Sequence, residues 1–102
     1  MLYSIFAYDI EDSLPLRKQA RPAHIARLEA LDAEGRLVLA GPNPNIDTTE
    51  TNEAGFSGSL IVAEFDTLQS ANAWAEADPY MQAGVYEYVE VKPFKQVFPK
   101  KT

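Results

Sequence analysis

The chain has 102 residues, with 15 acidic and 9 basic side chains, one histidine and no cysteine. This length suits one small domain, because two domains would each hold too few residues to bury a core. The net charge of −6 and the pI near 4.6 argue against sequence-independent binding of nucleic acid, which needs cationic side chains to neutralise phosphates.

Several other classes of protein and site drop out on composition and motifs. No run approaches the roughly 20 apolar residues that span a bilayer, and no secretory signal is visible at the N-terminus. Without cysteine, disulfides, thiolate nucleophiles and cysteine-based metal sites are excluded. One histidine and scattered carboxylates form no metal-ligand cluster, and no phosphate-binding loop or nucleophilic serine motif is present. We therefore expect a cytoplasmic protein that contacts neither nucleic acid nor membrane and uses no metal or cofactor.

The first third of the chain predicts a strand followed by a helix. Residues 2–10 are almost all apolar or aromatic, as in a strand buried on both faces. Residues 13–34 change to a helical period, in which Pro22 either begins the helix or kinks it and Gly35 ends it. The apolar stripe of this helix consists of Leu16, Ala20, His24, Leu28 and Leu31, whereas Arg17, Arg21, Arg27, Glu29 and Glu34 fall mostly on its other faces.

The middle of the chain predicts two strands joined by a long loop. Residues 36–40 form a short strand that ends at Gly41-Pro42. Residues 43–58 are polar and rich in Pro, Asn, Thr and Gly, which is typical of a loop. Loops of this length are often functional, so we expect it to screen a pocket from water. Residues 59–65 then show the clearest strand pattern in the chain.

The last third predicts a helix and a final strand. The helix spans residues 68–77, with Ala71, Trp74 and Ala75 on its inner face, and Asp78-Pro79 interrupts it. Residues 85–98 form a long aromatic-rich strand in which Pro93 indicates an edge position or a bend. We expect one domain over residues 1–98 and a frayed tail over 99–102.

The resulting order, βαββαβ, predicts a ferredoxin-like α+β fold. Two helices cover only one face of a four-stranded sheet, yet the first and last strands carry apolar side chains on both faces. One face of the first strand would hold Leu2, Phe6, Tyr8 and Ile10, and the same face of the last would hold Tyr86, Tyr88 and Phe94. Because monomers rarely expose so large an apolar patch, we expect a homodimer through this sheet face.

His24 is the residue best suited to acid–base chemistry, because it is the only side chain that normally titrates near neutral pH. A lone histidine within an apolar stripe is also typical of an ordinary core residue. A functional role requires a carboxylate that orients the ring, which either Asp78 or Asp9 can supply. Asp78 precedes a proline and can also cap a short helical turn at residues 80–82.

Four further residues are candidates for binding a substrate. Arg21 lies three residues before His24 and can face the same cleft to hold an anion, although most such arginines are surface charges. The other candidates are Asp9, Tyr80 and Ser59. The aromatic side chains are otherwise explained as core and interface residues.

Read together, the segments resemble the YCII family. The resemblance is carried over about residues 1–98 by the ordered motifs Arg21-Pro22-Ala23-His24-Ile25-Ala26-Arg27-Leu28, Gly35-Arg36-Leu37, Ala40-Gly41-Pro42, Gly55-Phe56-Ser57-Gly58-Ser59, Ala77-Asp78-Pro79-Tyr80, Ala83-Gly84-Val85-Tyr86 and Val91-Lys92-Pro93-Phe94-Lys95. It implies a dimeric α+β barrel of ferredoxin-like subunits with a histidine/aspartate site in a cleft. Certain members are dehydrochlorinases or lyase-like enzymes of aromatic-ring catabolism, and others have no known role.

On these grounds we expect a cofactor-independent enzyme of lyase or isomerase type. His24 would move a proton on a small ring or enol-type substrate, and Asp78 would hold the imidazole, with Asp9 as the alternative partner. A dimer that binds or senses a small molecule without turnover is the other reading. A structural module in which His24 and Asp78 only stabilise the fold is a third.

Overall fold

The computed structural model describes residues 1–50 and 53–100. Its elements are β1 (Leu2–Asp9), α1 (Leu14–Ala33), β2 (Leu37–Pro44), β3 (Phe56–Glu64), α2 (Leu68–Glu76), α3 (Pro79–Gln82) and β4 (Tyr86–Phe94). The predicted order βαββαβ is confirmed, with the one-turn helix α3 added after α2. None of the helices in the described ranges is long and apolar enough to cross a membrane.

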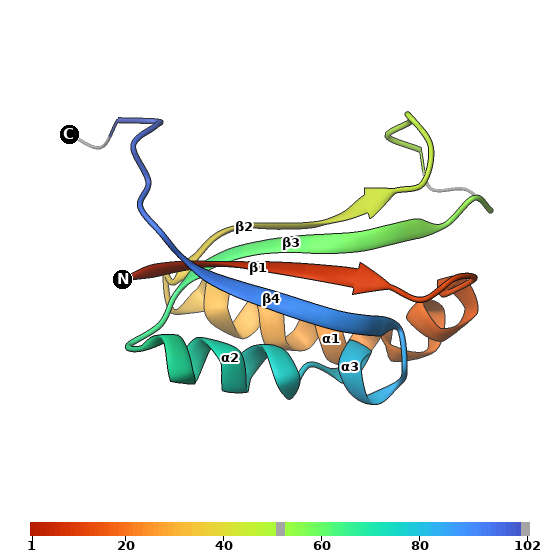
Figure 1. The fold of residues 1–102 in the computed structure, drawn as a ribbon, viewed down its shortest axis with the longest axis horizontal. Helices are drawn as coiled ribbons and strands as arrows, with labels where there is room; N and C mark the ends of the chain where they lie inside the picture. Colours follow the sequence, from red (N-terminus) through yellow and green to blue (C-terminus); the bar gives the residue numbers. More distant parts are fainter. Residues whose placement is uncertain (51–52, 101–102) are drawn as a thin grey trace.

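The four strands form one antiparallel sheet in the order β2-β3-β1-β4. The three helices of the described residues pack on one face of this sheet, and none of the described helices lies on the opposite face (Figure 1). This is the predicted ferredoxin-like α+β fold. β4 lies at an edge of the sheet, as Pro93 indicates, because an edge strand tolerates a residue without an N–H donor.

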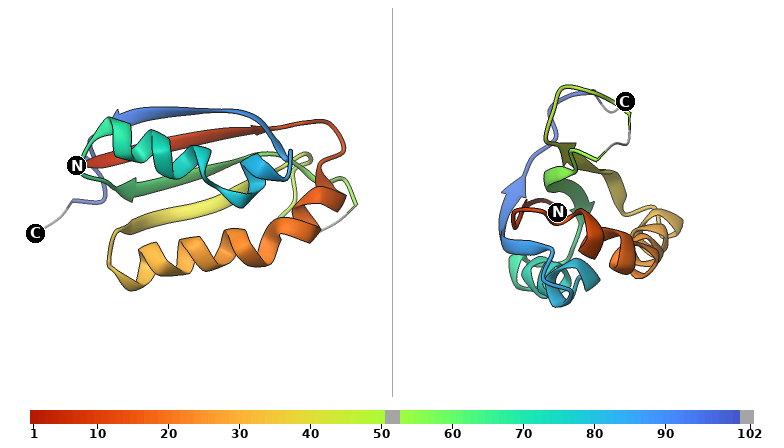
Figure 2. Two further views of the ribbon diagram at one scale, coloured as in Figure 1. Left: turned by 90° about the horizontal axis from the view of Figure 1, so that it is seen from below. Right: turned by 90° about the vertical axis from the view of Figure 1, so that its right-hand side faces the viewer.

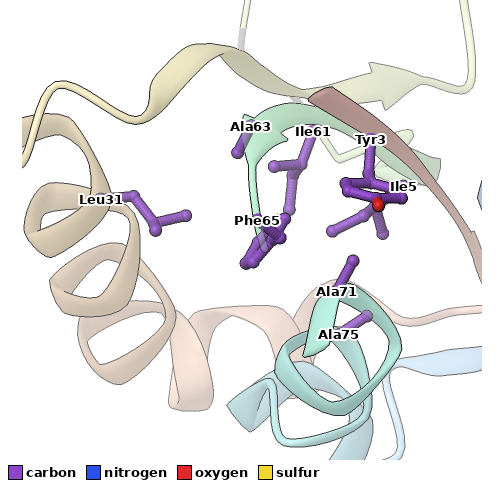
Figure 3. Packing of buried hydrophobic residues seen from close by; sticks show 8 residues of the cluster. All are labelled: Tyr3, Ile5, Leu31, Ile61, Ala63, Phe65, Ala71 and Ala75. Carbon is purple, nitrogen blue, oxygen red and sulfur yellow. The ribbon is translucent and has the colours of Figure 1, made fainter. Parts of the chain in front are cut away.

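The core lies between the sheet and the helices. Leu31 of α1 and Ala71 and Ala75 of α2 face the side chains of the central strands (Figure 3). The small residues of α2 let this helix approach the sheet closely, and Trp74 packs against the same cluster. The buried side chains are Tyr3, Ile5, Leu31, Ile61, Ala63, Phe65, Ala71 and Ala75. The predicted inner faces of both helices are therefore confirmed at these positions.

The strands around the long loop are longer than predicted. β2 continues through Gly41-Pro42 to Pro44, and β3 begins at Phe56. Pro42 pairs with Ser59 in the ladder, which is possible because β2 is an edge strand. The connection is thus residues 45–55 rather than 43–58, and its positions 51–52 lie outside the described residues.

Of the two alternatives for Pro22, a helix start is excluded, because the proline lies inside one continuous helix. Two other expectations need correction. The outer face of β1 is not buried in a single chain, since Tyr8 is exposed and Phe6 is partly exposed. Tyr86 lies on the buried side with Val85, because a register shift after Tyr8 places Tyr86 opposite Asp9 and turns it to the other face.

The C-terminal strand ends earlier than the predicted residue 98. Phe94 pairs with Leu2, the first residue of β1, so no partner strand continues beyond it. The chain then leaves the sheet on its uncovered side (Figure 1). Of the tail that we expected to fray, residues 101–102 lie outside the described residues.

Gly58 of β3 provides a test of this packing. A Cβ atom there would lie against the carbonyl oxygen of Ala7, closer than real atoms approach. We predict that Gly58→Ala lowers the free energy of unfolding by about 1–3 kcal/mol, as in other overpacked sites, measured by urea denaturation.

The matched control is Gly41→Ala. A Cβ at Gly41 meets no atom within 4 Å, and its backbone does not have a positive φ. This variant should unfold like the wild type. Equal stability of the two variants would contradict the packing of β3 against β1.

Candidate active site

A cleft of about 400 Å³ opens between α1 and the edge of the sheet. Helix α1 runs alongside β2 instead of crossing the middle of the sheet (Figure 2). As a result β2 is exposed along nearly its whole length, and space remains between the two elements. The lining consists of Leu14, Arg17, Lys18, Arg21, His24, Ile25 and Leu28 of α1, Ala40, Gly41 and Pro42 of β2, Phe56, Ser59 and Ile61 of β3, and Tyr80 of α3.

His24 and Asp78 form a buried pair beside this cleft. Nδ1 of His24 lies 2.9 Å and 3.0 Å from the two carboxylate oxygens of Asp78. The backbone N–H of Tyr80 donates to Oδ1 of the same carboxylate at 2.8 Å, so Asp78 is also the N-cap of α3. His24 is 6% exposed and Asp78 2%. Capping and ring orientation therefore coexist on one side chain.

The imidazole of His24 is held on its face as well as on its edge. The ring of Tyr80 stacks on it with a centroid separation of 3.9 Å and an interplanar angle of 11°. No residue of the described ranges hydrogen-bonds Nε2 of His24, and the side chain lines the cleft. A neutral ring whose Nδ1–H donates to Asp78 carries its lone pair on Nε2. In that tautomer the carboxylate orients the ring and Nε2 can accept a proton.

A second buried pair, Arg17 with Asp9, lies beside the cleft, and the arginine lines it. Nε of Arg17 donates to Oδ2 of Asp9 at 2.7 Å, and Nη2 of the same guanidinium donates to Oδ1 at 3.0 Å. Nη2 also donates to the carbonyl oxygen of Gly58 and to Oγ of Ser59. Burial acts to lower the pKa of Arg17, but hydrogen bonding and attraction to Asp9 outweigh it and raise this pKa above its ordinary value.

This arrangement corrects two sequence-based expectations. Asp9 is paired with Arg17, and His24 has Asp78, so Asp9 is not the alternative partner of the imidazole. Arg17 was expected on an outer face of α1 but is 5% exposed. The series 17, 21, 24, 28 and 31 has alternating steps of four and three, which places Arg17 on the His24 face. This spacing was the available signal for Arg17.

The predicted substrate-binding residues occupy different places around the cleft. Arg21 is exposed and lines the cleft together with Lys18. Tyr80 and Ser59 are buried and also line it, whereas Asp9 does not. The described residues of the 45–55 connection do not line it either. Within the predicted loop range of 43–58, however, Phe56 does line the cleft, and screening of the pocket by this loop stays a prediction.

The two tyrosines near Arg17 are held in their neutral form. Burial raises the pKa of Tyr80 and, more strongly, that of Tyr86. Both rings face the guanidinium of Arg17, whose central carbon lies 5.0 Å from the Tyr80 centroid and 5.9 Å from the Tyr86 centroid. The hydroxyl of Tyr86 is buried and has no hydrogen-bond partner among the described residues. Within the same ranges, no three His, Asp or Glu side chains are grouped to hold a metal ion.

Comparison with known proteins identifies the family. The model of the YCII-related domain matches residues 1–95. The chain belongs to the YCII family. It is 58% identical over 98 residues to Protein YciI of Escherichia coli O6:H1 and of Shigella flexneri, which covers 96% of this chain and 100% of each relative. An uncharacterised protein of Haemophilus influenzae is 55% identical over 98 residues, which again cover 96% of this chain and 100% of the relative.

A solved structure of similar fold adds a chemical comparison. The chain matches 5-chloro-2-hydroxyhydroquinone dehydrochlorinase (TftG) from Burkholderia phenoliruptrix, in complex with 2,5-dihydroxybenzoquinone, with a TM-score of 0.80 and 28% identity. The match covers 93% of this YCII chain and 94% of the TftG chain. The ferredoxin-like fold is thus shared with an enzyme that acts on a small ring compound.

Proposed function

We propose that the protein is an acid–base enzyme that moves a proton on a small ring or enol-type substrate. The observation that carries this proposal is the His24–Asp78 pair, in which Nδ1 of the ring meets the carboxylate while the histidine lines an open cleft. Nε2 of His24 would take a proton from a carbon atom of the substrate. The electron pair of the broken C–H bond would then form a carbon–carbon double bond, either as an enolate or with departure of a leaving group.

Asp78 would act through the imidazole and remain ionised. Its carboxylate fixes the tautomer that leaves Nε2 unprotonated, and it stabilises the imidazolium that forms when Nε2 accepts the proton. Tyr80 restricts the ring from its face. The imidazolium would return the proton to substrate or to the leaving group, so the side chain ends each cycle unchanged.

The similarity to a dehydrochlorinase supports this reaction class. Loss of HCl from a ring compound requires a base for the proton and a path for the departing chloride. A histidine oriented by a carboxylate supplies the base. The protein thus would carry out elimination or isomerisation with its own side chains and no cofactor.

The proposal is tested by following proton exchange in D₂O. Purified protein is incubated with a panel of enolisable and hydroxylated ring compounds, including 5-chloro-2-hydroxyhydroquinone, and deuterium uptake and chloride release are measured. We predict that His24→Gln and Asp78→Asn each lower the rate by about 10²–10⁴-fold, the usual contribution of a general base.

The Asp78→Asn variant should remain folded, because asparagine is as good an N-cap as aspartate. Asp32→Asn, an exposed change on α1, is the matched control and should keep the wild-type rate. Rates unchanged in His24→Gln would refute the proposal. If a panel compound binds but none of its protons exchange for deuterium, the alternative is favoured in which the protein binds or senses a small molecule without turnover.

We also propose that two copies associate through the uncovered face of the sheet. Large apolar side chains lie exposed there, including Tyr88 at 48%, Leu39 at 49% and Phe94 at 39%. Tyr8 stacks on Tyr88 at a centroid distance of 4.6 Å. A second copy is the occupant that we favour, because a twofold axis buries the same face in both chains.

The mass in solution tests this association. The wild type should have twice the 11.3 kDa mass of the chain by light scattering, and Tyr88→Glu should shift it toward the monomer. Leu68→Glu, at a position 42% exposed on α2, is the control and should leave the mass unchanged. A monomeric wild type at micromolar concentration would contradict the proposal.

A further inference from the structure

The lining of the cleft is basic, although the chain as a whole is acidic. Among the residues that the structure describes, three cationic side chains line it, Arg17, Lys18 and Arg21, and no aspartate or glutamate does. The chain has 15 acidic residues and 9 basic ones, so a third of the basic side chains meet at this cleft. Such a concentration of one charge sign raises the local potential and favours a ligand of the opposite sign.

Two of the three charges are not neutralised within the described part of the chain. Arg17 is compensated by Asp9. Lys18 and Arg21, in contrast, have no ion-pair partner among residues 1–50 and 53–100, and both are exposed at the rim. The carboxylates that line these two adjoining grooves, Asp12, Glu29 and Glu53, lie outside the cleft lining. The net positive charge offered to a ligand therefore comes from Lys18 and Arg21.

The positions of these groups on α1 set their spacing from the proposed base. Lys18, Arg21 and His24 follow one another at intervals of three residues on a continuous helix. Residues three apart on a helix are neighbours, with Cβ atoms about 5–6 Å from each other. If Arg21 binds the charged group of a substrate and Nε2 of His24 contacts the reacting carbon, these two parts of the substrate would therefore be separated by about the width of one ring.

The remaining walls of the cleft suit a flat apolar body. Leu14, Ile25, Leu28, Ile61 and Phe56 supply hydrocarbon and aromatic surface. A volume of about 400 Å³ falls in the range of small-molecule sites. These walls would hold a ring, while the cations at the rim would hold its charged substituent.

From this arrangement we infer that the ligand is a small planar anion, such as a ring carboxylate or an ionised hydroxyquinone, with its negative group bound by Arg21 and Lys18. The inference rests on the proposed function for the assignment of the reacting carbon to His24. The expected preference for a negatively charged ligand follows from the residues that line the cleft and does not depend on the catalytic role of His24. Neutral rings of the same shape would bind weakly, because they leave both cations without a partner.

Binding of charged and neutral probe pairs tests the inference without any need for turnover. The pairs are benzoate with benzamide, salicylate with salicylamide, and 2,5-dihydroxybenzoquinone with its dimethyl ether, titrated calorimetrically into the full chain. We expect the anion of at least one pair to bind at least about tenfold more tightly than its neutral partner, as one charge-assisted hydrogen bond provides. Added salt should weaken this binding.

Variants locate the charge selection. Arg21→Gln and Lys18→Gln should each weaken binding of the anion by about fivefold to tenfold and leave the neutral partner unaffected. Lys100→Gln removes the same charge in the tail and should have no effect. His24→Gln should abolish proton exchange and keep the preference for anions, so failure of the catalytic proposal would be seen separately.

Three results would overturn the inference. The first is equal or tighter binding of the neutral partner in every pair, and the second is an anion affinity that Arg21→Gln and Lys18→Gln leave unchanged. The third is the absence of saturable binding for all the anions tested.

Discussion

The carboxylate of Asp78 is the interaction on which the rest of the site depends. It caps α3 through the N–H of Tyr80 and holds Nδ1 of His24 at the same time. The cap places the ring of Tyr80 where it stacks on the imidazole, so one buried side chain positions both the edge and the face of the proposed base. A buried carboxylate is costly unless its charge is hydrogen-bonded, and here the two donors are the helix terminus and the histidine.

The cleft itself follows from how the sheet is covered. α1 lies beside the edge strand β2, which leaves the strand exposed and a space between the two elements. Arg17 lines this space and joins α1 to Asp9 of β1 and to Gly58 and Ser59 of β3. Because Asp9 neutralises Arg17, the positive charge available to a ligand is that of Lys18 and Arg21.

Much of this structure could be predicted from the pattern of the sequence. The order of elements, the inner face of α2 and the edge position of Pro93 follow from hydrophobic period and residue type, and Asp78 before Pro79 marked a helix cap. The length of β2 could not be predicted, since Gly41-Pro42 is ordinarily a strand end. The face of Tyr86 depends on a register shift between strands, which is a tertiary feature. Arg17 was missed because a charged side chain is buried only when a distant partner, here Asp9, neutralises it.

Nitrogen-15 NMR of the single histidine tests the central claim most directly. At a pH where the ring is neutral, the account predicts a proton on Nδ1 and a lone pair on Nε2 in the wild type. In Asp78→Asn, the amide oxygen should keep the Tyr80 N–H, so that the NH₂ group faces Nδ1 and the proton moves to Nε2. A wild-type ring protonated on Nε2, or a tautomer unaffected by Asp78→Asn, would contradict the account.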